Sequence, residues 1–598
     1  MKSIKVTLEN KKCKKFIVVG TLVLASIILL LILPLGHDLW YHIYRIGTMA
    51  SELQKNPWQL PVRMLADSYN GYGYGAALYY GDLFLYIPAV LICLGLDEVL
   101  AYKIFTVLIL WGTFLIAYRA ARLIKRKEEI ALDFAVFYTF SSCGLLNLCV
   151  RSAIGESLAF MFLPLVAASF GNILYGKRES RNWVLLGISM SVVAMSHMLT
   201  LALSAVVLCI WCLLENKKVF IEKKVIDILK AAGFMIGLSA SFLFPMFEQM
   251  LFQKVQTPGN NDYQKQAFMD YAVEWMDYFI PYEVKKILVS LFSISWNIET
   301  WHPGTIGLFG FIVIGTIILL KPVLNKKQIG IVVCSLSALV LLGITPVMDL
   351  VKEFAAFMQF PWRVLPLITL GLSFSGIWIL ENAKVVGVKK KKIEWCMMIG
   401  TLLIAVWAIG PRYAYQIYVQ RDDYAYIQEN NPDFYEKYKV CYDKNAGDAL
   451  YLPEGVPLSL YLERGEVVVA NTEEILFDWQ RTQNEINIHI RENECVNGVL
   501  ELPLYMYKGY VAKNADGENL SIVKSENGLV SVEIGDSVGE VSVWYQGTLV
   551  QKISDMVTLL TILSFLCGYR IIVYKSKRVK KCEEMSLVKY QDEGAKNL

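Results

Sequence analysis

The fold class is decided by the stretch KKCKKFIVVGTLVLASIILLLILPLGHDLWYHIYR, residues 11–45. Its apolar block, Phe16 to Gly36, follows four lysines and matches the roughly 20 apolar residues that a membrane-spanning helix needs. The block is longer than a signal-peptide core, and no small-residue cleavage site follows it. We therefore predict a membrane anchor whose basic N-terminus is cytoplasmic.

The composition extends this prediction to the whole chain. Of its 598 residues 55% are hydrophobic and 19% charged, and the apolar residues gather in blocks near the length of a span, which excludes a soluble class. The net charge is +4, and the basic residues cluster between apolar blocks. Such clusters are typical of topology signals, so we do not expect nucleic acid as a partner.

The basic clusters also test the number of crossings. They occupy residues 125–127, 177–181, 217–224, 321–327, 389–392 and 575–581, and all should be cytoplasmic. Counting both 83–96 and 100–121 as spans would place the 125–127 cluster outside. The first of these is short, contains Pro88 and ends at an acidic pair, so we predict a helix at the outer interface there.

The predicted fold class is a polytopic α-helical membrane protein with about twelve spans, cytoplasmic termini and an external β domain. Beyond the first block, the spans are expected near 100–121, 129–149, 155–175, 183–197, 199–215, 226–246, 304–320, 328–345, 363–380, 394–410 and 556–574. Residues 1–410 would form the membrane domain, with outer loops 37–99 and 247–303. Residues 556–598 would be the last span and a basic tail.

The stretch 411–555 has the composition of a soluble domain. Short β-branched or aromatic runs separated by turn residues predict a small antiparallel sandwich. These runs are 467–470, 486–490, 499–507, 529–534 and 541–545. Most cysteines lie in apolar blocks, and only Cys441 and Cys495 could form an external disulfide, a pairing that the sequence leaves open.

Polar residues collect at the external ends of the predicted spans. The densest group is GHDLWYHIYR, residues 36–45, where a helix would place Asp38, His42 and Arg45 on one face and Leu39, Ile43 and Ile46 toward the interface. A carboxylate beside an imidazole and a guanidinium could supply a general base and a cation for phosphate. Alternatively, Asp38 caps a surface helix and Arg45 contacts lipid headgroups. The local pattern favours neither interpretation.

Three further external positions carry the same two interpretations. RSAIGES, residues 151–157, holds Arg151 and Glu156 in a short turn, where a salt bridge is the simpler explanation. His197 stands at another tight turn, where a structural histidine is more common. QFPWR, residues 359–363, places Arg363 at a span entrance, as an interface anchor or as a bidentate phosphate ligand.

The first outer loop also contains GYGYG, residues 71–75, which lacks the lysine of a phosphate-binding loop. We expect a flexible loop over the interface in which Tyr72 and Tyr74 could stack on a sugar. His302, another external residue, is placed with these side chains in the predicted substrate cavity.

In their order, GHDLWYHIYR, GYGYG, RSAIGES and QFPWR resemble the bacterial YfhO-type proteins and the membrane family labelled 6-pyruvoyl-tetrahydropterin synthase-related. The run ELPLYMYKGYVAK, residues 501–513, shares this resemblance, which covers nearly the whole chain. These families are grouped with the GT-C glycosyltransferases, which take a sugar from a polyprenyl-phosphate carrier at the outer leaflet.

The resemblance implies a role for each matching residue. Asp38 would be the general base for an inverting transfer, and Arg363 would hold the donor phosphate with help from Arg45 or Arg151. Glu156 matches a position that binds a divalent metal, Mg or Mn, in some relatives, but no DxD motif accompanies it here. The substrate cavity would include the remaining candidates, His42, Glu156, His197, Tyr72, Tyr74 and His302.

The function implied is transfer of a sugar from a polyprenyl-phosphate donor to an envelope polymer or glycolipid at the bacterial plasma membrane. A lipid transporter or flippase would instead predict charged residues at mid-membrane depth and repeat symmetry, and we find neither. A non-catalytic envelope scaffold, with the β domain as its working part, is the third hypothesis. The sequence leaves open the sugar, the acceptor, the use of a metal, the oligomeric state and the role of loop 247–303.

Overall fold

The computed structural model describes most of the chain. The described residues are 2–33, 36, 38–176, 179–255, 261–272, 275–292, 305–430, 451–457, 465–471, 475–482, 485–493, 497–536 and 538–568. His302, Cys441 and Cys495 lie outside them, so the predictions made for these residues stay predictions.

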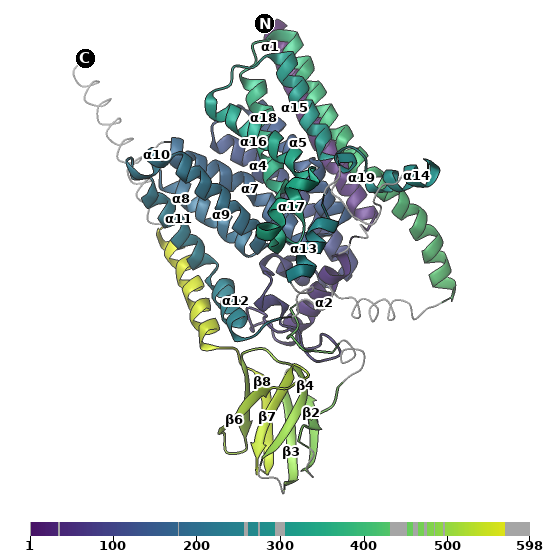
Figure 1. Ribbon diagram of the computed structural model, residues 1–598, viewed down its shortest axis with the longest axis vertical. Coiled ribbons are helices and arrows are strands. Elements are labelled where there is room, and N and C mark those ends of the chain that lie inside the picture. Colours follow the sequence, from purple (N-terminus) through teal and green to yellow (C-terminus); the bar gives the residue numbers. More distant parts are fainter. Residues whose placement is uncertain are drawn as a thin grey trace, which may run out of the picture.

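The protein is a multi-pass helical membrane protein (Figure 1). Six of its described helices are long and apolar enough to cross a bilayer, or nine if each of three bent helix pairs counts as one span. The described helices of the bundle are α1 (Lys2–Leu31), α2 (Leu39–Lys55), α3 (Tyr86–Cys93), α4 (Glu98–Leu123), α5 (Glu128–Thr139), α6 (Ser142–Leu145), η3 (Leu146–Val150), α7 (Ile154–Tyr175), α8 (Ser180–Ala194), α9 (Met198–Leu214), α10 (Asn216–Phe220), α11 (Val225–Leu238), α12 (Ala240–Phe252), α13 (Asn261–Asp270), α14 (Tyr282–Phe292), α15 (Ile306–Leu320), α16 (Lys326–Leu342), α17 (Thr345–Ala355), α18 (Leu365–Glu381), α19 (Gly387–Asn430) and the last described helix, Leu549–Gly568. Short 3-10 turns are η1 (Ala76–Leu78), η2 (Leu83–Leu85), η4 (Trp275–Tyr278), η5 (Ala356–Met358) and η6 (Pro361–Val364).

Each segment predicted as a span coincides with a helix or a bent helix pair. The bends measure 51° between α5 and the α6–η3 segment, 74° between α11 and α12, and 96° after α16. The number of crossings remains a prediction, because α8, α9 and α15 are apolar but short. The boundary predicted at residue 410 falls inside α19, which runs without a break to Asn430.

The segment predicted as an interfacial helix is short, as expected. Its apolar helix spans Leu83–Cys93 and packs against α2 and α4. The orientation predicted for α2 is wrong, however: Leu39, Ile43 and Ile46 are buried in the main core and do not face the interface. The outer loop folds back over α2, so this helix is covered by protein on the side that we expected lipid to cover.

The C-terminal domain is an antiparallel sheet, as predicted, but with three strands that the sequence pattern did not indicate. Its strands are β1 (Val468–Val469), β2 (Ile475–Thr482), β3 (Glu485–Asn493), β4 (Gly498–Tyr505), β5 (Tyr510–Asn514), β6 (Asn519–Lys524), β7 (Leu529–Gly535) and β8 (Gly539–Tyr545). They form one continuous sheet in the order β1-β4-β7-β6-β5-β8-β3-β2. The sheet curls around one core built by residues of both halves, so it is closer to a barrel than to two separate sheets.

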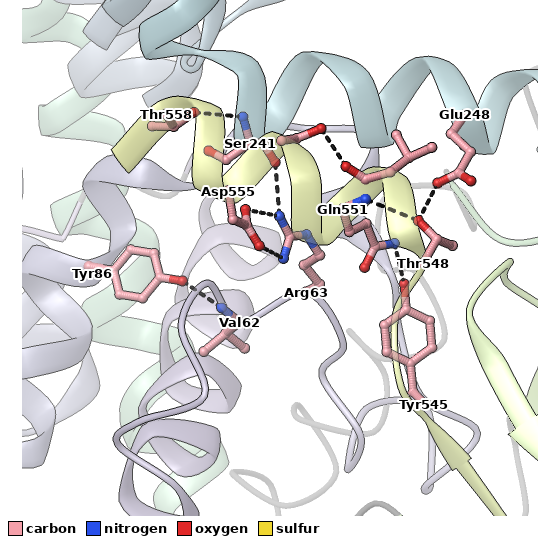
Figure 2. A network of polar contacts seen from close by, with 12 residues as sticks. Val62, Arg63, Tyr86, Ser241, Glu248, Tyr545, Thr548, Gln551, Asp555 and Thr558 are labelled. Atoms are coloured by element: carbon pink, nitrogen blue, oxygen red, sulfur yellow. Dashed lines mark hydrogen bonds and ion pairs between the residues drawn. The ribbon is translucent and has the colours of Figure 1, made fainter. Parts of the chain in front are cut away.

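The sheet lies at the end of the molecule opposite the N-terminus (Figure 1). Polar contacts join it to the bundle where β8 leads into the last helix (Figure 2). Arg63 of the first outer loop donates to both carboxylate oxygens of Asp555, at 3.0 and 2.5 Å, and to the carbonyl oxygen of Ser241 at 3.1 Å. One guanidinium therefore ties the outer loop, the α11–α12 bend and the last helix together.

Candidate functional site

A buried ionic cluster forms around Glu156, in the first turn of α7. Arg151 donates through Nη1 to Oε2 of Glu156 at 2.9 Å and through Nη2 to Oε1 at 3.4 Å, and Nη1 also donates to Asn147 Oδ1 at 2.8 Å. Arg363 Nε lies 3.4 Å from the same Oε1. One carboxylate thus holds two guanidinium groups that come from different parts of the chain.

Aromatic rings fix the orientation of both arginines. The guanidinium of Arg151 lies 4.1 Å from the centroid of the Trp362 ring, and that of Arg363 lies 4.9 Å from the Phe360 ring. These two rings are stacked on each other at 4.9 Å. Arg363 also donates through Nη1 to the carbonyl oxygen of Met358 at 2.9 Å. Cation–π contacts of this kind hold a guanidinium in place without neutralising its charge.

His197 joins the cluster as the N-cap of α9. The backbone N–H of Thr200 donates to its Nδ1 at 3.3 Å, so Nδ1 is the acceptor and the proton of the neutral ring lies on Nε2. Nε2 lies 3.9 Å from Glu156 Oε1, beyond hydrogen-bond distance. The histidine is therefore a structural cap, as the simpler interpretation held, that also points at the cluster.

Asp38 is the N-cap residue of α2, yet its side chain makes no capping hydrogen bond. Its backbone N–H donates to the carbonyl oxygen of Arg151 at 3.2 Å, and a Cβ on Gly36 would collide with the backbone of Arg151. Among the described residues the carboxylate has no hydrogen-bond or ion-pair partner. Desolvation raises the pKa of Asp38, while the charges of Arg151 and Arg363 oppose the rise.

His42 and Arg45 form a second polar group one and two turns along α2. Both are buried, and the guanidinium of Arg45 lies 5.1 Å from the ring centroids of Tyr41 and Tyr80. Burial raises the pKa of the nearby Asp82 to about 6, opposed by the charge of Arg45. Burial lowers the pKa of His42 well below its usual range, so its imidazole is neutral at physiological pH. Arg45 is thus separate from the Glu156 cluster.

Tyr80 and Tyr451 connect the two groups. Tyr80 lies under Arg45, and a Cβ on Gly155 would collide with its hydroxyl oxygen. The ring of Tyr451 lies 6.2 Å from that of Tyr80, and the charges of Asp38, Arg45 and Arg363 act on the pKa of its phenol, which burial raises. The structure therefore brings Asp38, Arg151, Glu156, His197 and Arg363 into one region, with Arg45 and His42 of α2 beside it.

The rings of Tyr72 and Tyr74 are not free to stack on a ligand. Both are buried: Tyr72 stacks on Tyr505 of β4 at 5.1 Å, and Tyr74 packs edge-on against Tyr69 at 5.0 Å. Arg481 of β2 donates to the carbonyl oxygen of Gly71. The GYGYG segment is therefore an ordered seam against the β domain, and the expected flexible loop with sugar-stacking rings is wrong.

The residues around Glu156 do not fit a divalent metal. Both of its oxygens face guanidinium groups, which occupy the directions in which a cation would bind. No group of three or more histidine, cysteine, aspartate or glutamate side chains suited to a metal occurs within the part of the chain that the structure describes.

Sequence reasoning missed a second buried ionic cluster, at the other end of the bundle. Lys14 Nζ of α1 lies 2.6 Å from Asp133 Oδ1 of α5 and 2.6 Å from Glu394 Oε1 of α19. Lys14 was interpreted only as a topology signal, and Asp133 sits in an apolar block. The three residues lie on three different helices, so no i, i+3 or i+4 spacing along the sequence marks the cluster.

Comparisons of this chain with known proteins find similarity only to solved structures. No family model matches it, and no curated protein sequence does. Among solved structures, arabinofuranosyltransferase AftD from Mycobacteria is similar at 14% identity and a TM-score of 0.36, over 65% of this chain and 26% of that one. ArnT from Cupriavidus metallidurans bound to undecaprenyl phosphate is similar at 13% identity and a TM-score of 0.30, over 66% of this chain and 77% of that one.

This chain thus spans about a quarter of the length of AftD. TM-scores this low do not establish a shared fold, and the resemblance to YfhO-type proteins stays an expectation. The function proposed below rests on the geometry of this chain.

Proposed function

We propose that this protein is a glycosyltransferase that moves a sugar from a polyprenyl-phosphate donor to an envelope acceptor at the outer face of the bacterial plasma membrane. The single observation that carries the proposal is the carboxylate of Asp38. The backbone N–H of Asp38 donates to the carbonyl oxygen of Arg151, one of two partly buried arginines at the site, and the carboxylate has no hydrogen-bond or ion-pair partner among the described residues. A carboxylate kept free in such a site is suited to accept a proton.

In the proposed reaction Asp38 takes the proton from an acceptor hydroxyl. The acceptor oxygen then forms a bond to the anomeric carbon of the sugar, and the bond from that carbon to the phosphate oxygen breaks. The configuration inverts, and the polyprenyl phosphate leaves with the bonding electrons. Charge thus develops on the phosphate during the transfer.

Arg363 supports the leaving group in this proposal. Its guanidinium is oriented by Phe360 and Met358, so its position is set before the donor binds. Preorganised cations at a developing negative charge are the most effective form of electrostatic stabilisation. Arg151 is engaged by both oxygens of Glu156, which makes it a positioning residue that holds Glu156, and through it Arg363, in place.

The topology in this proposal follows the positive clusters. Both termini are cytoplasmic, and the sheet lies outside, on the same side as the Asp38 region. The opposite ends taken by the N-terminus and the sheet in Figure 1 support this arrangement. A lipid donor would then reach the site from the outer leaflet, and the acceptor from the aqueous side.

The test is sugar transfer by the purified protein in detergent, given a panel of polyprenyl-phosphate sugars and an envelope acceptor fraction. We expect product with at least one lipid-linked sugar and none with the corresponding soluble sugar nucleotides. Arg363→Ala should lower kcat by about 100-fold or more. Absence of transfer from every lipid-linked sugar by folded wild-type protein would refute the proposal.

A further inference from the structure

The segment Tyr451–Val456 joins the β domain to the bundle close to the Asp38 region. Leu452 and Val456 are buried in the main core of the bundle. Pro453 pairs with Val255 in an isolated antiparallel bridge, and the backbone N–H of Glu454 donates to the carbonyl oxygen of Lys254 at 3.1 Å. The segment is therefore anchored to the bundle both by buried side chains and by its backbone, and its position beside the site is defined.

Tyr451, at the start of this segment, has a φ of 66°. A non-glycine residue in the left-handed region costs roughly 1–2 kcal/mol, so the surrounding contacts must hold it there. The hydroxyl of Tyr507 donates to the carbonyl oxygen of Tyr451 at 3.0 Å. Such outliers gather at functional sites, where the strain places a side chain that an unstrained backbone would direct elsewhere.

The ring of Tyr451 packs against two tyrosine rings of the first outer loop. It stacks on Tyr79 with centroids 5.8 Å apart and planes 13° apart, and it lies 6.2 Å from the ring of Tyr80. Tyr80 in turn lies under the guanidinium of Arg45. The two rings fix the direction of the phenol, which is a rigid group with few torsions to order when a ligand binds.

The hydroxyl of Tyr451 has no hydrogen-bond partner within the described ranges, although its ring packs against those of Tyr79 and Tyr80. Its charged neighbours are Arg45, Arg363 and Asp38. Burial raises the pKa of this phenol, so the hydroxyl keeps its proton and can donate. A phenol with a free donor, on a ring that packs beside the Tyr80 ring under Arg45, is suited to an anion, because a phosphate oxygen can accept from both tyrosine and arginine donors.

We propose that Tyr451 is a substrate-contacting residue whose hydroxyl donates to the phosphate of the lipid-linked donor, so that the C-terminal segment completes a site otherwise built by the bundle. This inference rests on the proposed function for the identity of the ligand. It explains why the outer loop and the β domain meet through stacked tyrosines: the seam holds Tyr451 at the phosphate.

The test is direct binding of a polyprenyl phosphate to the full chain in detergent, measured by native mass spectrometry, for wild type and Tyr451→Phe. The substitution keeps the ring, its stacking and the backbone, and removes only the donor. We expect binding to weaken about 10- to 100-fold, as for loss of a hydrogen bond to a charged group. The neutral polyprenol should bind both proteins equally and more weakly.

Tyr545→Phe is the matched control. This tyrosine also lies at the seam, where its hydroxyl accepts from Gln551 Nε2 at 2.8 Å (Figure 2), but its surroundings contain none of the site arginines proposed to hold phosphate. We expect Tyr545→Phe to bind polyprenyl phosphate as wild type does. Equal melting temperatures for the three proteins would show that all are folded.

The outcomes separate the two proposals. If wild type binds polyprenyl phosphate and Tyr451→Phe binds it equally well, the role of Tyr451 is refuted while the proposed function stands. If Tyr451→Phe and Tyr545→Phe weaken binding to the same degree, the effect belongs to the seam, and the role of Tyr451 is again refuted. If folded wild type does not bind polyprenyl phosphate, the proposed function fails, and the inference fails with it.

Discussion

Two carboxylates of the candidate site have opposite surroundings, and this difference is the reason for the different roles that we propose for them. Glu156 is engaged by Arg151 and Arg363, whereas Asp38 has no such partner among the described residues. A carboxylate held by two cations is a poor proton acceptor and a good support. A free one in the same field is available for chemistry.

Replacing Glu156 by Gln should destabilise the protein. The change leaves two guanidinium groups without their counter-charge in a site where the side chains of Arg151 and Glu156 are 13% and 7% exposed. Breaking a buried pair in this way costs about 3–5 kcal/mol. The measurement is thermal unfolding in detergent. The matched control is Glu179→Gln, which breaks the exposed pair with Arg181 and should cost less than about 1 kcal/mol. Equal effects of the two substitutions would contradict the buried cluster.

The pH dependence of transfer should report Asp38. A general base must be ionised, and desolvation raises the pKa of Asp38 above the ordinary value of 3.8. We therefore expect kcat/KM to fall with decreasing pH through a pKa above 3.8, with a slope of one proton. A profile that is flat across the acidic range in which the protein stays folded would argue against Asp38 as the base.

The same shift has a consequence for stability, with the opposite sign to activity. A raised pKa means that the folded state binds the proton more tightly than the unfolded state, so stability rises as pH falls through the folded pKa. At neutral pH the ionised carboxylate is therefore a cost. Asp38→Asn should melt at the same temperature as wild type or higher at pH 7, and calorimetry or dye-based melting measures this. A clear drop in the melting temperature would mean that the carboxylate has a structural partner.

Close backbone approaches decide how the elements meet around the site. A Cβ on Gly155 in α7 would collide with the hydroxyl of Tyr80 and lie 2.7 Å from the carbonyl oxygen of Ser196. Gly20 in α1 has no atom within 4 Å of the corresponding position. Of these two glycines in apolar helices, only Gly155 lies where a larger side chain would collide with its neighbours.

Alanine at these two positions should separate packing from helix propensity. Gly155→Ala should destabilise by about 1–3 kcal/mol, because it overpacks the contact with Tyr80. Gly20→Ala should be neutral or stabilising by up to about 1 kcal/mol, because alanine is the better helix former. Thermal unfolding measures both, and a loss of stability in Gly20→Ala comparable to that in Gly155→Ala would contradict the packing assigned to α7.

The elements themselves were largely predictable, and their contacts were not. Apolar blocks and basic clusters located the helices, including the short one at Leu83–Cys93, because lipid imposes length and charge rules that act along the chain. The buried face of α2 was mispredicted because the rest of the outer loop folds back over it, which no pattern within α2 shows. Strands β2, β5 and β6 were missed because polar residues interrupt them, so they contain no extended β-branched or aromatic run.

The same distinction holds for the site. Asp38, Glu156 and Arg363 could be singled out as candidates because the predicted spans hold almost no charges, so the charges at their ends are easy to see. Tyr451 and Asp82 were not, because a tyrosine in a loop or an aspartate after GYGYG carries no local signal. Their importance comes only from what the fold brings beside them.

At the scale of the whole molecule, salt bridges join elements distant in sequence at two opposite ends. Lys14, Asp133 and Glu394 close the end near the N-terminus, and Arg63 with Asp555 closes the end near the sheet (Figure 2). Between these two groups of salt bridges the bundle places the Asp38 region close to the sheet. The proposed function requires that the sheet side be external.

Cysteine labelling should establish this orientation. In a variant lacking native cysteines, we expect Asp516→Cys, in the exposed turn between β5 and β6, to react with a membrane-impermeant thiol reagent added to intact cells. Lys389→Cys, at the start of α19, should react only after the cells are opened. The reverse pattern would place the sheet in the cytoplasm and exclude chemistry at the outer face.

If Asp38 is the base of a sugar transfer, its amide variant should bind the donor and fail to transfer the sugar. Wild type and Asp38→Asn would be assayed side by side for transfer from the polyprenyl-phosphate sugar that wild type uses, after melting curves show that both are folded. We predict a fall in kcat of at least about 100-fold in Asp38→Asn, with binding of the donor retained. Transfer by folded Asp38→Asn at the wild-type rate would contradict the account.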